Sequence, residues 1–181
     1  METAGKVRRV ALLTASEDVL AAVLALNEAA EEETAPLDPA RLAALLRTAA
    51  FAEALVDAGG EVLAFLIGFD HAADYDSPNF LWFRDRMDRF AYVDRVVVAE
   101  AARGRGLARA LYAAYADHAR AHALERLVCE VNRVPPNPRS DAFHAALGFA
   151  EVGRGAPVQG KLVRYLARPV AEGVAAPAAG A

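Results

Sequence analysis

Apolar residues along the chain fall into short runs rich in β-branched and aromatic residues and into longer segments with helical spacing. The short runs predict strands at residues 7–15, 89–98, 123–131, 149–154 and 161–169, and a two-stranded hairpin within 50–70 around a turn at 57–60. Helical spacing follows the predicted N-caps Ser16 and Asp38 and the glycine loop at 103–106, and a short helix is predicted from Ser140 to Leu147. Residues 71–89 mix aromatic and charged side chains without a steady period, so we predict a long functional loop there.

The order of these elements predicts a mixed α/β sheet with helices on both faces. The strand at 89–98 leads through a loop and a helix to the strand at 123–131, which requires a parallel crossover. The hairpin within 50–70 implies antiparallel neighbours. We therefore expect a single domain over residues 1–168, followed by a flexible tail at 169–181 rich in Ala, Pro and Gly.

A glycine-containing loop, "RGRGLA" at residues 103–108, joins the predicted strand at 89–98 to a helix. A turn with two glycines is one interpretation. The other is an anion site, because the free N–H groups of a helix N-terminus attract negative charge, and Arg103 and Arg105 add positive charge. The spacing does not fit the P-loop pattern, and it fits the dinucleotide fingerprint poorly because a third glycine is missing.

Two segments resemble the motifs of the GNAT acetyltransferase superfamily. "RGRGLA" is similar to the signature Q/R-x-x-G-x-G/A, with Arg103, Gly106 and Ala108 in its fixed positions. "NPRSDAFHAALGF" is similar to the closing motif N-x-x-(A/S)-x-x-(F/L)-Y-x-x-x-G-F, and its matching residues are Asn137, Ser140, Phe143, Gly148 and Phe149. The resemblance implies a mostly antiparallel, twisted mixed sheet, helices on both faces, and a parallel strand pair that splays apart, commonly through a bulge.

The resemblance also implies that the protein binds acetyl-CoA as a co-substrate. The pyrophosphate would be held by the backbone amides of Arg103, Gly104, Arg105, Gly106, Leu107 and Ala108. The pantetheine arm would pair with the backbone of Val96, Val97 and Val98, and the Val96 amide would polarise the thioester carbonyl. Asn137 and Ser140 would contact the cofactor from the opposite wall.

Two carboxylates are candidates for the base that removes a proton from an attacking amine. Glu130 ends a predicted buried strand, and in some GNAT enzymes that acetylate protein N-termini a glutamate at this place is the base. The alternative for Glu130 is an ion pair with Arg95 or Arg133. Asp94 shares a strand face with Tyr92 and Val96, and its alternative is a structural pair with Arg95. The sequence favours Glu130 and leaves the choice open.

His144 occupies the position at which the family usually carries a tyrosine that protonates the CoA sulfur. An imidazolium can donate that proton and titrates near neutral pH, so a pH-dependent rate is expected. The alternative is a helix-surface histidine that packs on Phe149.

The acceptor is expected to contact side chains from the segment 71–89 and from the neighbouring strand. These substrate-binding candidates are Tyr75, Asn79, Trp82, Tyr92 and Asp94. Aromatic rings give such a wall its shape, and acids can pair with an amine. A flap that buries its aromatic residues on the sheet is the alternative.

Composition and net charge exclude several classes of binding partner. The chain has 181 residues and a net charge of −4, which argues against bulk nucleic-acid binding, and its apolar runs are too short for a membrane span. The one cysteine, Cys129, excludes an internal disulfide, and the pair His118 and His122 lacks the further ligands of a metal site. We expect a cytoplasmic protein that binds no metal. The sequence does not decide whether the protein forms a homodimer.

These observations predict an N-acetyltransferase that moves an acetyl group from acetyl-CoA to a small-molecule or peptide amine by direct attack in a ternary complex. The alternative is a non-catalytic acyl-CoA-binding sensor or regulatory module. A nucleotide-binding protein that uses the same loop is a third, weaker hypothesis. The sequence does not identify the acceptor.

Overall fold

Seven strands form one mixed sheet in a computed structural model that describes residues 7–30 and 34–170 of the chain. The sheet has the order β1-β2-β3-β4-β5-β7-β6, and each neighbouring pair is antiparallel except β4–β5. The strands are β1 (Arg8–Ala11), β2 (Phe51–Val56), β3 (Val62–Asp70), β4 (Phe90–Val98), β5 (Arg126–Val134), β6 (Ala150–Gly155) and β7 (Leu162–Pro169). The predicted mixed, mostly antiparallel sheet with a parallel pair is confirmed.

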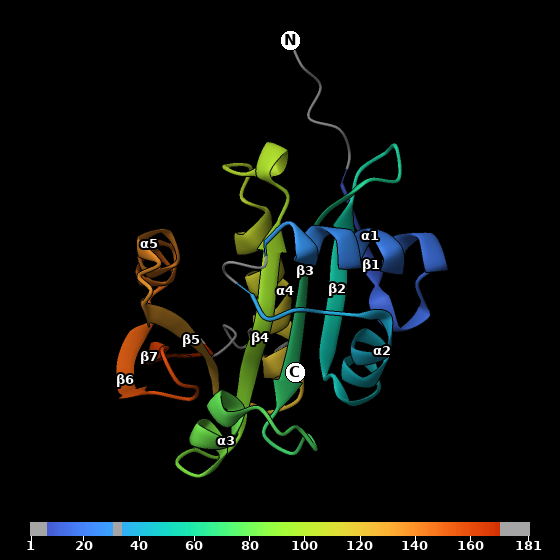
Figure 1. Cartoon of the computed structure of the whole chain (residues 1–181). Helices are drawn as coiled ribbons and strands as arrows, with labels where there is room; N and C mark the ends of the chain where they lie inside the picture. Colours follow the sequence, from blue (N-terminus) through green and yellow to red (C-terminus); the bar gives the residue numbers. More distant parts are fainter. Residues whose placement is uncertain (1–6, 31–33, 171–181) are drawn as a thin grey trace, which may run out of the picture.

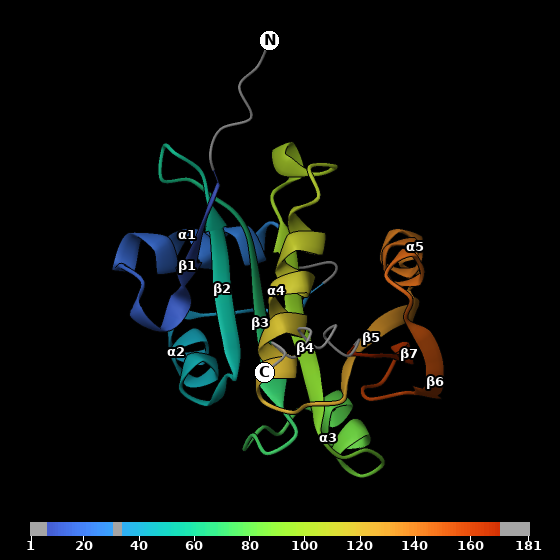
Figure 2. The same cartoon turned by 180° about the vertical axis from the view of Figure 1, so that it is seen from behind.

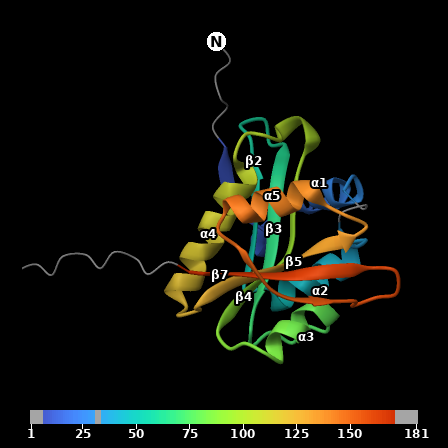
Figure 3. The ribbon, with the colours of Figure 1, turned by 90° about the vertical axis from the view of Figure 1, so that its left-hand side faces the viewer.

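Helices lie on both faces of this sheet, as predicted. The helices are α1 (Glu17–Glu28), α2 (Pro39–Thr48), α3 (Pro78–Arg84), α4 (Leu107–Ala121) and α5 (Pro138–Ala146), with short 3₁₀ turns at Leu12–Thr14 and Glu100–Ala102. α1 and α2 lie in front of the sheet in Figure 1, and α4 lies in front when the molecule is seen from behind in Figure 2. α5 lies beside β5 and β7 in Figure 3.

Side-chain caps fix where three of the helices begin. The Ser16 hydroxyl accepts a hydrogen bond from the Val19 amide at 3.4 Å, and the Asp38 carboxylate accepts one from the Arg41 amide at 2.7 Å. Both caps were predicted. The Asn137 side chain caps α5 in the same way, and Pro138 occupies the first helical position, where a missing N–H costs nothing.

The prediction of a long loop over residues 71–89 is wrong in one respect, because this segment contains α3. The helix has seven residues, fewer than two turns, which is too short to show a countable hydrophobic period. Packing stabilises so short a helix more than its own hydrogen bonds do. Phe80 and Phe83 are fully buried, and each contacts Phe90 at the start of β4.

β4 and β5 begin as neighbours and then diverge. Their pairing covers Phe90–Tyr92 and Arg126–Val128, at the end of the sheet near α3. Just beyond it, the register between β3 and β4 shifts, so that Asp94 is an extra residue in β4 without a β3 partner. Figure 1 shows β5 curving away from β4 toward α5. The predicted splayed strand pair and its bulge are confirmed.

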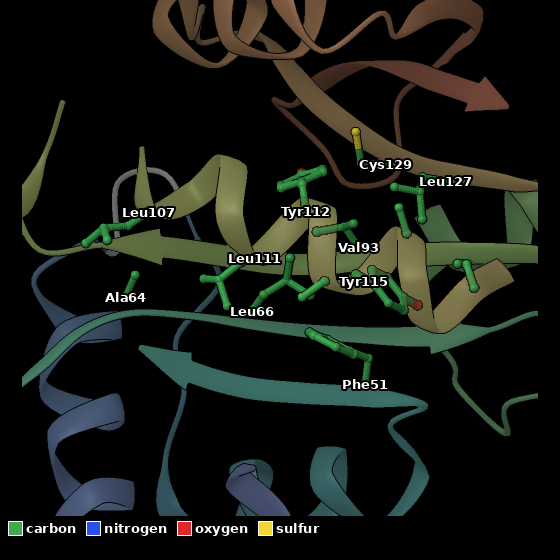
Figure 4. Close-up of a cluster of buried hydrophobic side chains, with 14 of the residues drawn as sticks. Phe51, Ala64, Leu66, Val93, Leu107, Leu111, Tyr112, Tyr115, Leu127 and Cys129 are labelled. Carbon is green, nitrogen blue, oxygen red and sulfur yellow. The ribbon is translucent and has the colours of Figure 1, made fainter. Parts of the chain in front are cut away.

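Two apolar cores lie on opposite faces of the sheet and keep the diverging strands in place. One core packs α4 on the sheet, and its members in Figure 4 include Phe51, Leu111, Tyr112, Tyr115 and Cys129. The other core packs α1, α2 and α3 on the opposite face. Side chains of β4 and β5 on this opposite face of the sheet therefore point toward the side that carries α1, α2 and α3.

Candidate active site

A cavity of about 580 Å³ opens where β4 and β5 separate. Its lining comes from both faces of the sheet. From the face of α4 and α5 come Arg103, Ala108, Tyr112, Ser140 and His144. From the opposite face come Pro36, Arg41, Tyr75 and Asn79. The cavity therefore crosses the sheet.

Just beyond the last paired residues of β4 and β5, each strand carries a carboxylate, Asp94 on β4 and Glu130 on β5. Tyr92 pairs with Val128, so continuing the same register would place Asp94 opposite Glu130. In parallel strands, residues at matching positions point to the same face, and here that face carries α1, α2 and α3. Asp94 and Glu130 both line the cavity.

Neutral donors hold the Glu130 carboxyl. The Tyr92 hydroxyl donates to Glu130 Oε2 at 2.9 Å and lies 3.1 Å from Oε1, and Asn79 Nδ2 donates to Oε1 at 2.9 Å. The predicted alternative, an ion pair of Glu130 with Arg95 or Arg133, is wrong, because Arg95 pairs with Asp94 and the acid is held by a phenol and an amide.

Burial raises the pKa of Glu130 to about 8, and the negative charge of Asp94 adds to this effect. The hydrogen bonds from Tyr92 and Asn79 act in the opposite direction, since they stabilise the ionised carboxylate. A carboxyl with a pKa near 8 exchanges its proton close to neutral pH, which is what a general base requires.

Asp94 has a different environment, because it is paired with a buried cation. Its Oδ2 accepts a hydrogen bond from Arg95 Nε at 2.9 Å, and both side chains are more than nine-tenths buried. Its Oδ1 accepts a hydrogen bond from the Tyr75 hydroxyl at 2.5 Å. The structural pair with Arg95, which the sequence offered as the alternative for Asp94, is therefore present.

Arg95 also connects β4 to the segment between α1 and α2. Its Nη1 donates to Asn27 Oδ1 at 3.0 Å and to the Ala35 carbonyl at 3.2 Å. Asn27 is fully buried, and its amide donates to the same carbonyl at 3.1 Å. Asp94 thus joins two walls of the cavity, one through Arg95 and the other through Tyr75.

His144 lies at the other end of the cavity and is buried with a hydroxyl neighbour. Its Nδ1 is 2.7 Å from the Ser140 carbonyl, so Nδ1–H is the donor there, and the neutral Nε2 accepts the Tyr112 hydroxyl proton at 2.8 Å. Burial lowers the pKa of His144, because the imidazolium is the form that loses hydration. The predicted packing on Phe149 is also present, with ring centroids 5.2 Å apart.

The glycine loop forms a turn into α4 whose conformation suits glycine. Gly104 and Gly106 have φ angles of 76° and 77°, in the left-handed region. Gly106 is the N-cap, so the first amides of α4 are free of intrahelical acceptors. Beyond Tyr92, the edge of β4 that faces β5 is likewise unpaired in the described chain, and it carries the backbone of Val96–Val98.

Most of the predicted site residues meet at this cavity. The predicted residues that line it are Tyr75, Asn79, Tyr92, Asp94, Val96, Val97, Val98, Arg103, Ala108, Glu130, Asn137, Ser140 and His144. Gly104, Arg105, Gly106 and Leu107 lie in the adjoining turn and helix start and are not part of its lining. Trp82 is not part of the lining either, because its ring stacks on Tyr165 at 4.0 Å.

Two residues that hold site residues in place, Tyr112 and Tyr165, were not predicted, and Arg95 was predicted only as a partner of Asp94 or Glu130. Tyr112, Tyr165 and Arg95 act through partners 32, 86 and 68 positions away in the sequence, namely His144, Asn79 and Asn27. Tyr112 belongs to the apolar stripe of α4, so its periodicity indicates core packing alone. Its neighbours Cys129 and Val93 are visible beside it in Figure 4.

The comparisons with known proteins agree with this fold. The model of the acetyltransferase (GNAT) family matches residues 20–149. Ard1 from Thermoplasma volcanium superposes with a TM-score of 0.71 at 19% identity, covering 94% of this chain and 100% of that one. The ribosomal-protein-S18-alanine N-acetyltransferase from Escherichia coli gives 0.66 at 18% identity, with 93% and 96% covered. An N-acetyltransferase from Staphylococcus aureus Mu50 gives 0.66 at 17%, with 92% and 99% covered.

A search of curated proteins finds no match to the chain. The structural likenesses are all below 25% identity and show the fold, whereas the family model covers most of the sequence. The chain belongs to the acetyltransferase (GNAT) family. Within the described residues, none of the helices is long and apolar enough to cross a membrane.

Proposed function

We propose that the protein is an N-acetyltransferase that transfers an acetyl group from acetyl-CoA to an amine in a ternary complex. The observation that carries this proposal is the buried Glu130 carboxyl, whose pKa is close to 8, in a cavity that is lined from both faces of the sheet. The amine would reach the cavity from the side of α2 and α3, and acetyl-CoA from the side of α4 and α5.

The donor side offers what acetyl-CoA needs. The unpaired edge of β4 at Val96–Val98 can pair with the amides of a pantetheine arm, as an added strand would. The start of α4 presents free N–H groups to a pyrophosphate. Arg103, Arg139 and Lys161 line the same cavity and supply positive charge for phosphates.

In the proposed reaction, Glu130 takes a proton from the acceptor ammonium. The free amine nitrogen then bonds to the acetyl carbon and loses its second proton to water, and the carbon–sulfur bond breaks to release the CoA thiolate. Asp94 is proposed as a wall of the acceptor site and not as the base, because it is already paired with the buried Arg95 guanidinium, whereas neutral donors hold Glu130. This assignment gives the two carboxylates separate roles.

The proposed proton source for the thiolate is His144 together with Tyr112. Both residues line the cavity, and they share a hydrogen bond of 2.8 Å. The lowered pKa of His144 makes its imidazolium a stronger acid than an exposed histidine, although a scarcer one at neutral pH. The neutral imidazole holds the Tyr112 hydroxyl in place.

Release of free thiol tests the proposal. The protein is mixed with acetyl-CoA and a panel of small amines and short peptides, including a peptide that begins with alanine because of the substrate named for the E. coli neighbour. We expect turnover on at least one acceptor and a loss of about 10²-fold or more in Glu130→Gln. Tight CoA binding without turnover on any acceptor would instead support the sensor hypothesis.

A further inference from the structure

We propose that Asn79 and Tyr165 are positioning residues that fix the Glu130 carboxyl and leave Oε2 as the oxygen that exchanges a proton with the acceptor. This inference rests on the proposed function of Glu130 as the base. Oε1 lies within hydrogen-bond distance of both Asn79 and Tyr92, at 2.9 and 3.1 Å. Among the described residues, the Tyr92 hydroxyl, at 2.9 Å, is the one side chain that donates to Oε2, which so retains accepting capacity.

Tyr165 determines which way the Asn79 amide faces. The Tyr165 hydroxyl donates to Asn79 Oδ1 at 3.1 Å, which leaves Nδ2 as the end that faces Glu130. Asn79 stands in the first turn of α3, directly after Pro78, so its backbone is fixed by the start of the helix. The chain Tyr165–Asn79–Glu130 thereby links β7, α3 and β5.

The Tyr165 ring is itself held from α3 and β6. Trp82 stacks on it with centroids 4.0 Å apart and an angle of 18° between the planes. Gly153 leaves room for this stack, because a Cβ there would lie 2.4 Å from the Trp82 ring. Trp82 therefore supports the positioning chain from outside the cavity.

The groups around Glu130 act on its charge in opposite directions. The donors Asn79 and Tyr92 stabilise the carboxylate, and Asp94 destabilises it. The other titratable or charged groups nearest to it are Cys129 on β5, Tyr165 on β7, Tyr112 on α4, and Tyr75 and Arg95 around Asp94. Removing the Asn79 donor should therefore raise the pKa of Glu130.

The test measures the acidic limb of kcat/KM against pH in the full chain. Asn79→Leu, close in size but without a donor, is expected to move the limb upward by about 1 pH unit, the size of a hydrogen bond to a charged group. Tyr165→Phe keeps the stack on Trp82 and is expected to give a smaller shift in the same direction. The double variant should shift no further than Asn79→Leu, because Tyr165 acts through Asn79.

A second readout separates this inference from the proposed function. The Glu130 carboxyl band is followed by infrared spectroscopy during a pH titration and identified by its loss in Glu130→Gln. An unmoved carboxyl titration in both Asn79→Leu and Tyr165→Phe, folded by circular dichroism, would overturn the inference. A moved titration with an unmoved rate limb would support the positioning contact and refute Glu130 as the base. Arg84→Gln, on the exposed end of α3, is the matched control and should shift neither.

Discussion

At the scale of single residues, Glu130 has neutral donors around it instead of a cation, and this environment keeps its proton until mildly alkaline pH. For the proposed reaction, the base must be ionised. In His144→Phe, which removes the titration of the imidazole, we therefore expect kcat/KM to rise with pH and to level off above about pH 8. Steady-state rates between pH 6 and 9.5 measure this limb. A profile that is flat through pH 8, with an acceptor whose own titration lies outside the range, would contradict it.

The same pKa predicts a change in stability. Glu130 has an ordinary pKa of 4.5 and a value of about 8 in the folded protein, so between these values the folded state binds more protons than the unfolded state. The Glu130 contribution to the free energy of unfolding therefore falls as pH rises from about 4.5 to 8. Glu130→Gln, which resembles the protonated acid, should lose less stability over this window than the wild type in urea titrations at several pH values.

His144 and Tyr112 make a second prediction at this scale. The imidazolium of His144 becomes rarer as pH rises, and burial, which lowers its pKa, makes it rarer still at any given pH. His144→Phe is therefore expected to reduce turnover about tenfold or more at pH 6, and less at pH 9. Single-turnover rates at saturating acetyl-CoA measure this ratio. Turnover equal to the wild type at every pH would refute a catalytic role for His144, and Tyr112→Phe shows what the hydroxyl alone contributes.

The sequence predicts a feature of the site best where a single residue type is unusual at its position in a strand or turn. Glu130 was found because an acid at the end of an apolar strand is unusual, and Gly104 and Gly106 because a glycine turn joins a strand to a helix. The partners of these residues were not found, since Asn79 reaches Glu130 across 51 positions and no short pattern encodes that contact. Which nitrogen of His144 faces Tyr112 likewise depends on the assembled fold.

At the scale of elements, the start of α4 makes a prediction for Gly106. A Cβ at this position meets no atom within 4 Å, so alanine is disfavoured by its φ of 77° alone, by about 1 kcal/mol. Gly106→Ala is expected to destabilise the fold by that amount and to weaken acetyl-CoA binding several-fold, measured by calorimetry.

Gly60→Ala is the matched control. Gly60 also has a positive φ, 92°, but it lies in the turn between β2 and β3. We expect a similar loss of stability and unchanged acetyl-CoA affinity. Equal losses of affinity in Gly106→Ala and Gly60→Ala would show that the effect of Gly106 is not local.

The buried pair of β4 makes a second prediction at the element scale. Arg95→Met leaves the Asp94 carboxylate buried beside Tyr75 without its cation, so a loss of about 3 kcal/mol in the free energy of unfolding is expected. The double variant Asp94→Asn/Arg95→Met should recover part of that loss in urea titrations. Arg126→Gln removes a more exposed pair with Glu125, and a change of less than about 1 kcal/mol is expected.

At the scale of the whole molecule, acetyl-CoA is expected to stabilise the fold, because the proposed site joins β4, α4 and α5. At a ligand concentration of about 100 times Kd, the gain is about 2.7 kcal/mol. Thermal unfolding with and without acetyl-CoA measures it. The nucleotide-binding hypothesis would be favoured if ATP raised Tm by the same amount and if neither CoA nor acetyl-CoA displaced the bound ATP.

The cavity that passes between β4 and β5 has a consequence for the order of events. Its lining comes from both faces of the sheet, so the proposed donor and acceptor would approach it from opposite faces. Under the proposed function, neither molecule would block the approach of the other, and the acetylated amine would be able to leave while CoA is still bound. The separation of β4 and β5 would thus let the two molecules meet inside the sheet while each stays on its own face.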